Sequence, residues 1–158
     1  MQRNLILRTA IVGFATGIRS MAGVAILAAR AYSNPRGFKG TRFGWLAYRP
    51  VAALFGLMAA GEVVVDKLPI LPARTAPGPL YGRIQFSALA GSALFTEADA
   101  PAWQGALLGA VSSVAGAFAG YNYRTRVARA LNVPDLPVAL VEDAATAALG
   151  VAALKTYD

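Results

Sequence analysis

The ionisable residues best placed for chemistry lie inside or at the ends of apolar segments. In the stretch GEVVVDKLPILPAR, residues 61–74, Glu62 and Asp66 are four residues apart and Lys67 follows directly. Residues four apart share one face of a helix, so the two carboxylates are expected to point in one direction. Carboxylates held in an apolar setting bind cations or relay protons in many membrane proteins.

A second acidic pair lies in the last apolar segment, LPVALVEDAATAALGVAAL. Glu142 and Asp143 are adjacent, and adjacent helical residues point about 100° apart, so we expect the two side chains to face different neighbours. Arg19, inside the first apolar segment, and Lys67 are the obvious counter-charges. An ionised side chain costs about 2.5–3.5 kcal/mol in the centre of a lipid bilayer, so such groups usually face the interior of a helical bundle.

These observations predict one polar site between helices. Its ion- or proton-binding residues are expected to be Glu62, Asp66, Glu142 and Asp143, with Arg19 and Lys67 as charge partners. The alternative is a set of interhelical ion pairs that fixes packing and has no further role.

The rest of the chain is unusually apolar. Of its 158 residues, 56% are hydrophobic and 15% are charged, whereas about 25% are charged in a typical soluble domain. So few charges could not cover the surface of a soluble domain of this size. We therefore expect a single all-α domain over residues 1–158: a polytopic helical membrane protein whose partner is the lipid bilayer, in a bacterial inner membrane.

Five apolar segments are expected to supply four to five spans, and they cover residues 5–31, 51–68, 84–95, 101–123 and 136–154. The first is longer than one span, so it is either a tilted helix or a helix broken at Gly17. The third is short, and it is either extended through the preceding YGR or re-entrant. If five spans alternate between the two sides of the membrane, the N-terminus and the 67–83 loop share one side. The distribution of basic residues weakly favours the cytoplasm for that side.

Residue types exclude several chemistries. The chain has no cysteine and no histidine, so it lacks disulfides, thiol chemistry and the usual ligands of zinc, copper or haem. A Ser-His nucleophile is excluded for Ser112 and Ser113, and no glycine lies in a phosphate-binding loop. We expect no cofactor, and an enzyme is the least favoured class.

The net charge of +7 has a membrane explanation. In the loop RAYSNPRGFKGTRFGWLAYRP, basic residues alternate with aromatic residues, a mixture typical of the lipid headgroup layer. We therefore expect no nucleic-acid partner.

Small residues form a stripe along the fourth apolar segment and recur in the first. The glycines are Gly105, Gly109, Gly116 and Gly120, with Gly13 and Gly17 in the first segment. Such residues let helix backbones approach closely in lipid. They predict helix packing within or between subunits, and we expect a homodimer.

The stretch GEVVVDKLP, followed by an arginine and a small-residue helix, resembles an uncharacterised family of integral membrane proteins known as domain of unknown function 4126. The positions that match that family's motif are Glu62, Asp66, Lys67, Pro69 and Arg83. The specific part of the resemblance covers about 25 residues, and the loop here is shorter and less aromatic. The resemblance implies a multi-pass helical protein, adds Arg83 as a charge partner and brings no established activity.

Three functions fit these residues. A transporter or channel for a cation or proton explains buried acids on two helices. A structural membrane subunit explains the small-residue stripe and makes the charges packing contacts. A lipid headgroup-binding or lipid-modifying protein would use the basic residues on phosphates. A cavity that reaches Glu62 and Glu142 would favour transport.

Overall fold

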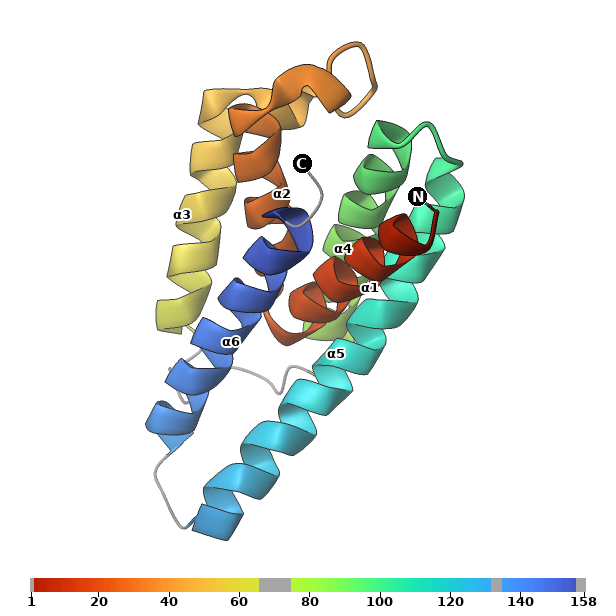
Figure 1. Cartoon of the computed structure of the whole chain (residues 1–158). Coiled ribbons are helices and arrows are strands. Elements are labelled where there is room, and N and C mark those ends of the chain that lie inside the picture. The colour runs from red at the N-terminus through yellow and green to blue at the C-terminus, as the bar shows by residue number, and fades with distance from the viewer. Residues whose placement is uncertain (1, 66–74, 132–134, 156–158) are drawn as a thin grey trace.

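The computed structural model describes residues 2–65, 75–131 and 135–155, and all regular structure within these ranges is helical (Figure 1). The α-helices are α1 (Gln2–Ile18), α2 (Ala22–Ser33), α3 (Arg49–Val65), α4 (Pro77–Glu97), α5 (Ala102–Leu131) and α6 (Asp135–Lys155). Two 3₁₀ turns, η1 (Pro35–Gly37) and η2 (Gly44–Ala47), connect α2 to α3. The predicted all-α class is confirmed for the described residues.

The first apolar segment forms two helices. The helical pattern of α1 continues to Arg19, whose amide donates a hydrogen bond to the carbonyl of Ala15 at 2.8 Å. The chain then turns at residues 19–21 and α2 begins, so of the two alternatives for this segment the broken helix is the observed one, with the break shortly after Gly17. A Cβ atom at Gly23 would collide with a threonine hydroxyl of α1, so this close turn requires glycine there.

The helices α1 and α2 both reach the same end of the bundle. Arg8, near the start of α1, lies 3.8 Å from the carboxylate of Glu97. Arg30, near the end of α2, lies 3.0 Å from the same carboxylate. Figure 1 shows α1 entering the bundle and α2 returning from its middle. The first apolar segment therefore reverses direction at the break, and its two ends lie at the same end of the bundle.

The third apolar segment forms one complete helix, so the alternative of a short re-entrant element is not the one observed. The helix α4 begins at Pro77 and continues for 21 residues to Glu97. Proline suits the first turn of a helix because the amide that it lacks would have no intrahelical partner. The helix includes the YGR triplet, so the extended alternative is the observed one.

Small residues bring α1, α4 and α5 into close contact. A Cβ atom added to Gly91 of α4 or to Gly105 of α5 would collide with the carbonyl oxygen of the other. One turn along, the Ser87 hydroxyl donates a hydrogen bond to the Gly109 carbonyl at 2.7 Å. Similar close approaches join α1 to α5 at Gly13, Gly17 and Gly116, and Gly120 is buried. The small-residue face thus packs within one chain, so it no longer argues for the expected homodimer.

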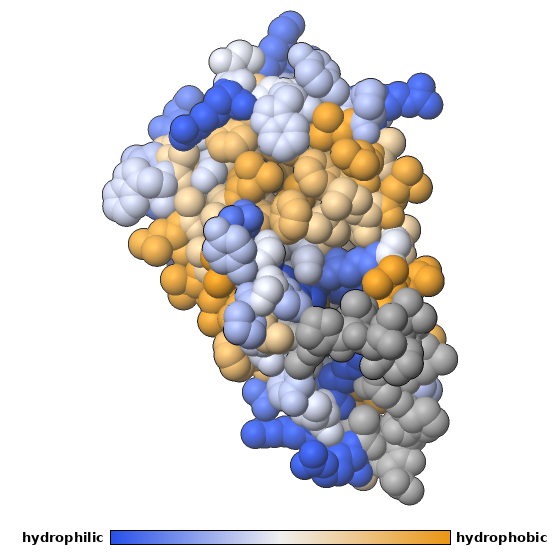
Figure 2. Space-filling view, turned by 180° about the vertical axis from the view of Figure 1, so that it is seen from behind, coloured by the Kyte–Doolittle hydropathy of each residue, from blue (hydrophilic) through white to orange (hydrophobic). Residues whose placement is uncertain are grey.

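Large apolar side chains cover much of the outside. On α5, Trp103, Leu107 and Val111 are 67%, 59% and 61% exposed, at a spacing of four residues that places them on one face. The only buried residue of α3 is Phe55. Figure 2 shows hydrophobic residues across the middle of one face, with hydrophilic residues at its two ends.

Length and composition together single out one membrane-spanning candidate among the described residues. It is Ala102–Val127 of α5, while α2 is apolar but shorter. The predicted count of four to five spans, and with it the multi-pass arrangement, stays a prediction.

The connection between α2 and α3 folds into a compact cap. Phe38, Phe43 and Leu46 are buried in the core and hold the cap on the bundle. Its cations point outward: Arg36, Lys39, Arg42 and Arg49 are exposed, as are the rings of Tyr32, Trp45 and Tyr48. The residues that alternate along this loop therefore divide between two faces of the cap: the inner face is apolar, and the outer face carries the cations.

Candidate functional site

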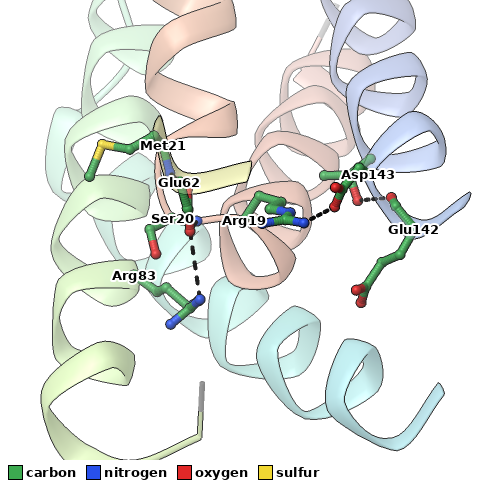
Figure 3. Close-up of polar contacts among 8 residues, drawn as sticks. Arg19, Ser20, Met21, Glu62, Arg83, Glu142 and Asp143 are labelled. Carbon is green, nitrogen blue, oxygen red and sulfur yellow. Dashed lines mark hydrogen bonds and ion pairs between the residues drawn. The ribbon is translucent and has the colours of Figure 1, made fainter. Parts of the chain in front are cut away.

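Glu62 of α3 points at the break between α1 and α2 (Figure 3). Its two carboxylate oxygens accept hydrogen bonds from the backbone amides of Ser20 at 2.8 Å and Met21 at 2.9 Å. The Met21 side chain makes no capping bond of its own. The start of a helix has amides without intrahelical acceptors and a partial positive charge, and a carboxylate satisfies both. Glu62 therefore caps α2 from another helix.

Arg83 of α4 supports Glu62 from the opposite side. Its Nη2 atom lies 3.7 Å from Oε1 of Glu62, and its Nη1 atom donates to the carbonyl of Pro79 at 3.2 Å. Arg83 is 4% exposed, so the interaction is shielded from bulk solvent. One carboxylate thus links α2, α3 and α4.

Arg19 pairs with α6 rather than with Glu62. Nη2 of Arg19 donates to Oδ1 of Asp143, with the arginine side chain 5% and the aspartate side chain 13% exposed. Arg19 lies in the turn between α1 and α2, and its guanidinium points from this turn toward α6 (Figure 3). Two ion pairs, Glu62–Arg83 and Arg19–Asp143, therefore flank the same turn.

Glu142 turns away from this turn, as the helical angle between adjacent residues predicts. It is 4% exposed, and its carboxylate points away from the Arg19–Asp143 pair in Figure 3. The hydroxyl of Thr146 donates to the backbone carbonyl of Glu142 at 2.7 Å. Asp143 and Glu142 thus serve different sides of α6.

Two cavities lie on these two sides. One has a volume of about 250 Å³, lies between α2, α3 and α6, and includes Arg19, Glu62 and Asp143 in its lining. The other has a volume of about 260 Å³, lies between α1, α5 and α6, and includes Glu142. Thr146 of α6 lines both cavities, so the two cavities lie on either side of this helix.

Asp66 and Lys67, the remaining predicted site residues, lie outside the described residues. Among the described residues, no group of three or more acidic side chains is placed to hold a metal ion. Two guanidinium groups stand beside the acids at the break, and they repel a multivalent cation. The described charges at the break therefore do not suit a multivalent metal ion.

Sequence reasoning missed a second charge cluster at the opposite end of α4. Glu97 bridges Arg8 and Arg30, and its side chain also fills the space beside Gly37. Arg8 and Arg30 each lie eleven residues from Arg19. Because the chain reverses direction near Arg19, this equal spacing places Arg8 and Arg30 at the same level along the bundle. The equal spacing was therefore the sequence feature that could have predicted the cluster.

Comparisons of the chain with protein-family models, with curated proteins and with solved structures find no match. The resemblance to the uncharacterised membrane family stays a prediction.

Proposed function

We propose that this chain is a multi-pass membrane protein that moves protons through its helical bundle. Support for the membrane setting comes from the outer faces of α3 and α5, where large apolar side chains are exposed. Soluble monomers rarely expose contiguous apolar patches of this kind. The close glycine contacts of α4 and α5 fit the same setting, because lipid provides no hydrophobic drive for helix association.

The observation that carries the proton proposal is the pair of cavities on opposite sides of α6. One cavity reaches Glu62 and Asp143, and the other reaches Glu142. In this proposal a carboxylate takes up a proton on one side of α6 and releases it on the other side after a side-chain rotation. Arg19 and Arg83 repel a metal cation at the break, so the proposal excludes a multivalent ion as the cargo.

The test uses purified protein in vesicles with a pH gradient and an internal pH-sensitive dye. Wild type is expected to dissipate the gradient faster than protein-free vesicles. Glu142→Gln keeps the size of the side chain but cannot exchange a proton, so it should slow the flux by at least about tenfold. Glu62→Gln tests the other cavity in the same way.

The matched control is Asp99→Asn. Asp99 is exposed in the α4–α5 turn with φ 53°, a conformation that asparagine also tolerates, and it is remote from both cavities. Its flux should equal that of wild type. Absence of flux in wild type would overturn the proposal, and normal flux in Glu142→Gln would remove that residue from the pathway.

A second candidate function is structural, with the charges as packing contacts. The observation in its favour is that Glu62 already satisfies two backbone amides and lies beside Arg83. Lipid headgroup binding or modification is less favoured, because Arg19 and Arg83 face carboxylates inside the bundle. A dimer, if formed, would have to use a surface other than the packed glycine face.

A further inference from the structure

The cap that connects α2 to α3, residues 34–49, carries exposed positive charge and no acidic residue. Its exposed cations are Arg36, Lys39, Arg42 and Arg49. The first acidic residue of the chain is Glu62, which lies beyond the cap. Within the described part of the chain, none of the four cations forms an ion pair. The outer face of the cap therefore carries net positive charge.

Glu97 of α4 lies against the cap, but its charge is already balanced. A Cβ atom at Gly37 would lie 2.7 Å from the Cγ atom of Glu97. The carboxylate of Glu97 lies 3.8 Å from Arg8 and 3.0 Å from Arg30, which belong to α1 and α2. Asp99, in the turn after α4, adds one exposed negative charge against the four exposed cations of the cap. The positive charge of the cap thus remains available to an anionic partner.

Hydrogen bonds hold the backbone of the cap in one conformation. The amides of Phe38 and Lys39 donate to the carbonyl of Pro35, at 3.1 Å and 2.9 Å. The hydroxyl of Thr41 donates to the carbonyl of Phe38 at 2.8 Å. Gly40 turns the chain with φ 82°, a conformation that glycine adopts readily. Cations on such a frame lose less conformational freedom on binding than cations on a mobile loop.

Aromatic rings are exposed in the same cap as the cations. Trp45 and Tyr48 are 36% and 64% exposed. The ring of Trp45 packs against Phe55 of α3, with the ring centroids 6.3 Å apart, so it is fixed beside the start of that helix. Rings with a polar edge and basic side chains occur together in the headgroup layer of a bilayer. The cap therefore has the composition of a surface that faces headgroups.

The exposed apolar surface of the bundle begins beside the cap. Leu57 of α3 is 72% exposed and lies eight residues after Arg49, or about 12 Å along the helix. On α5, the exposed rings of Trp103 and Tyr123 are 20 residues or about 30 Å apart, which matches the hydrocarbon thickness of a bilayer. Figure 2 shows the hydrophobic band below the hydrophilic end of the molecule. With these apolar faces in lipid, the cap lies at the level of the headgroups.

We infer that the outer face of the cap binds anionic lipid headgroups of the surrounding bilayer, with its four cations at the phosphates. The inference rests on the membrane setting of the proposed function and adds a lipid preference to it. It does not use Arg19 or Arg83, which face carboxylates inside the bundle. Guanidinium groups form strong hydrogen bonds to phosphate, and an anionic leaflet attracts basic segments. Nucleic acid offers the same phosphates but would leave the adjoining apolar surface of α3 uncovered.

The test uses the fluorescence of Trp45 to report which lipids lie beside the cap. The chain has two tryptophans, so Trp103→Phe gives a reporter protein in which Trp45 is the remaining one. This protein is reconstituted into vesicles of phosphatidylglycerol and phosphatidylcholine in equal amounts, with one or the other lipid brominated near its headgroup. Bromine quenches tryptophan by contact, so the two quenching levels give a relative association constant.

Phosphatidylglycerol should be favoured at least about fivefold at low ionic strength, since one basic side chain near an anionic surface contributes roughly that factor. The preference should disappear at about 1 M salt, where the screening length is about 3 Å. Arg36→Gln combined with Arg42→Gln should lower the preference at least about threefold. Both arginines are exposed, so the fold should tolerate the change.

The matched control is Arg126→Gln combined with Arg129→Gln. It removes the same charge from two exposed arginines near the far end of α5, and the quenching of Trp45 should stay unchanged. If the cap variant fails to fold, the comparison of the two lipids and its salt dependence in the reporter protein still decide the inference.

Equal quenching by the two lipids, quenching by neither, or an undiminished preference in the cap variant would each overturn the inference. Duplex DNA is the probe for the other partner. DNA binding in detergent that the cap variant loses, without a preference for phosphatidylglycerol, would assign the cap to nucleic acid instead. The proposed function fails separately: a lipid preference without proton flux keeps the cap surface and overturns proton transport, and flux without a lipid preference does the reverse.

Discussion

Glu62 on α3 accepts a hydrogen bond from the amide of Met21, forty-one residues earlier in the chain, at 2.9 Å. The start of α2 is therefore held by a side chain of a different helix. This arrangement lets the chain reverse inside the bundle, because the amides at the turn would otherwise lack acceptors. The same carboxylate lines a cavity, so the proposed role in proton exchange would fall on a residue that also caps a helix.

The capping role predicts a graded loss of stability at Glu62. Glu62→Leu removes both acceptors and should lower the free energy of unfolding by about 2–4 kcal/mol, because two backbone amides lose their hydrogen bonds. Glu62→Gln keeps one carbonyl acceptor and should cost roughly half as much. Thermal unfolding in detergent measures both. Stabilities of both variants equal to that of wild type would show that the capping bonds contribute nothing.

The Arg19–Asp143 ion pair predicts strong coupling between two residues that lie 124 positions apart. Arg19→Met alone should destabilise the protein by about 3–5 kcal/mol, because it leaves the partly buried carboxylate of Asp143 without its guanidinium. Adding Asp143→Leu should recover most of that loss, since buried pairs can often be replaced together. A double-mutant cycle of unfolding measures the coupling. Additive losses would contradict the pair.

The glycine contacts predict opposite effects for two alanine substitutions. Gly105→Ala places a Cβ atom against the carbonyl of Gly91, so it should destabilise the fold by at least about 1–3 kcal/mol. Gly56 of α3 has open space around its missing Cβ, so Gly56→Ala should stabilise the helix by about 0.5–1 kcal/mol. Thermal unfolding compares the two. Because the Gly105 contact lies within one chain, its effect should be independent of protein concentration.

The reversal at residues 19–21 predicts which positions share a side of the membrane. The chain has no cysteine, so single-cysteine variants report accessibility without background. Arg3→Cys and Lys39→Cys should react with a membrane-impermeant thiol reagent from the same side, and Arg126→Cys from the opposite side. All three native positions are exposed. Labelling of Arg3→Cys together with Arg126→Cys would restore strict alternation and contradict the reversal.

Sequence alone determined the helical class and the location of the acids within apolar segments, and it named Gly17 as one possible break while leaving an unbroken tilted helix open. These properties depend on local composition and on the 3.6-residue helical period, which are readable without a fold. The different directions of Glu142 and Asp143 were predictable for the same reason, because adjacent helical residues point about 100° apart. The small-residue face on α5 was also visible, because the spacing of its glycines is a property of one helix.

Only the tertiary structure decided which charges meet. Arg19 contacts Asp143 instead of Glu62, Glu62 binds backbone amides, and Glu97 gathers Arg8 and Arg30. Helical periodicity states which face a side chain occupies, but its partner depends on crossing angles and on where the chain reverses. Those are set by close contacts such as Gly91 with Gly105, between helices distant in sequence. For the same reason, the use of the glycine face within one chain became clear only from the packed bundle.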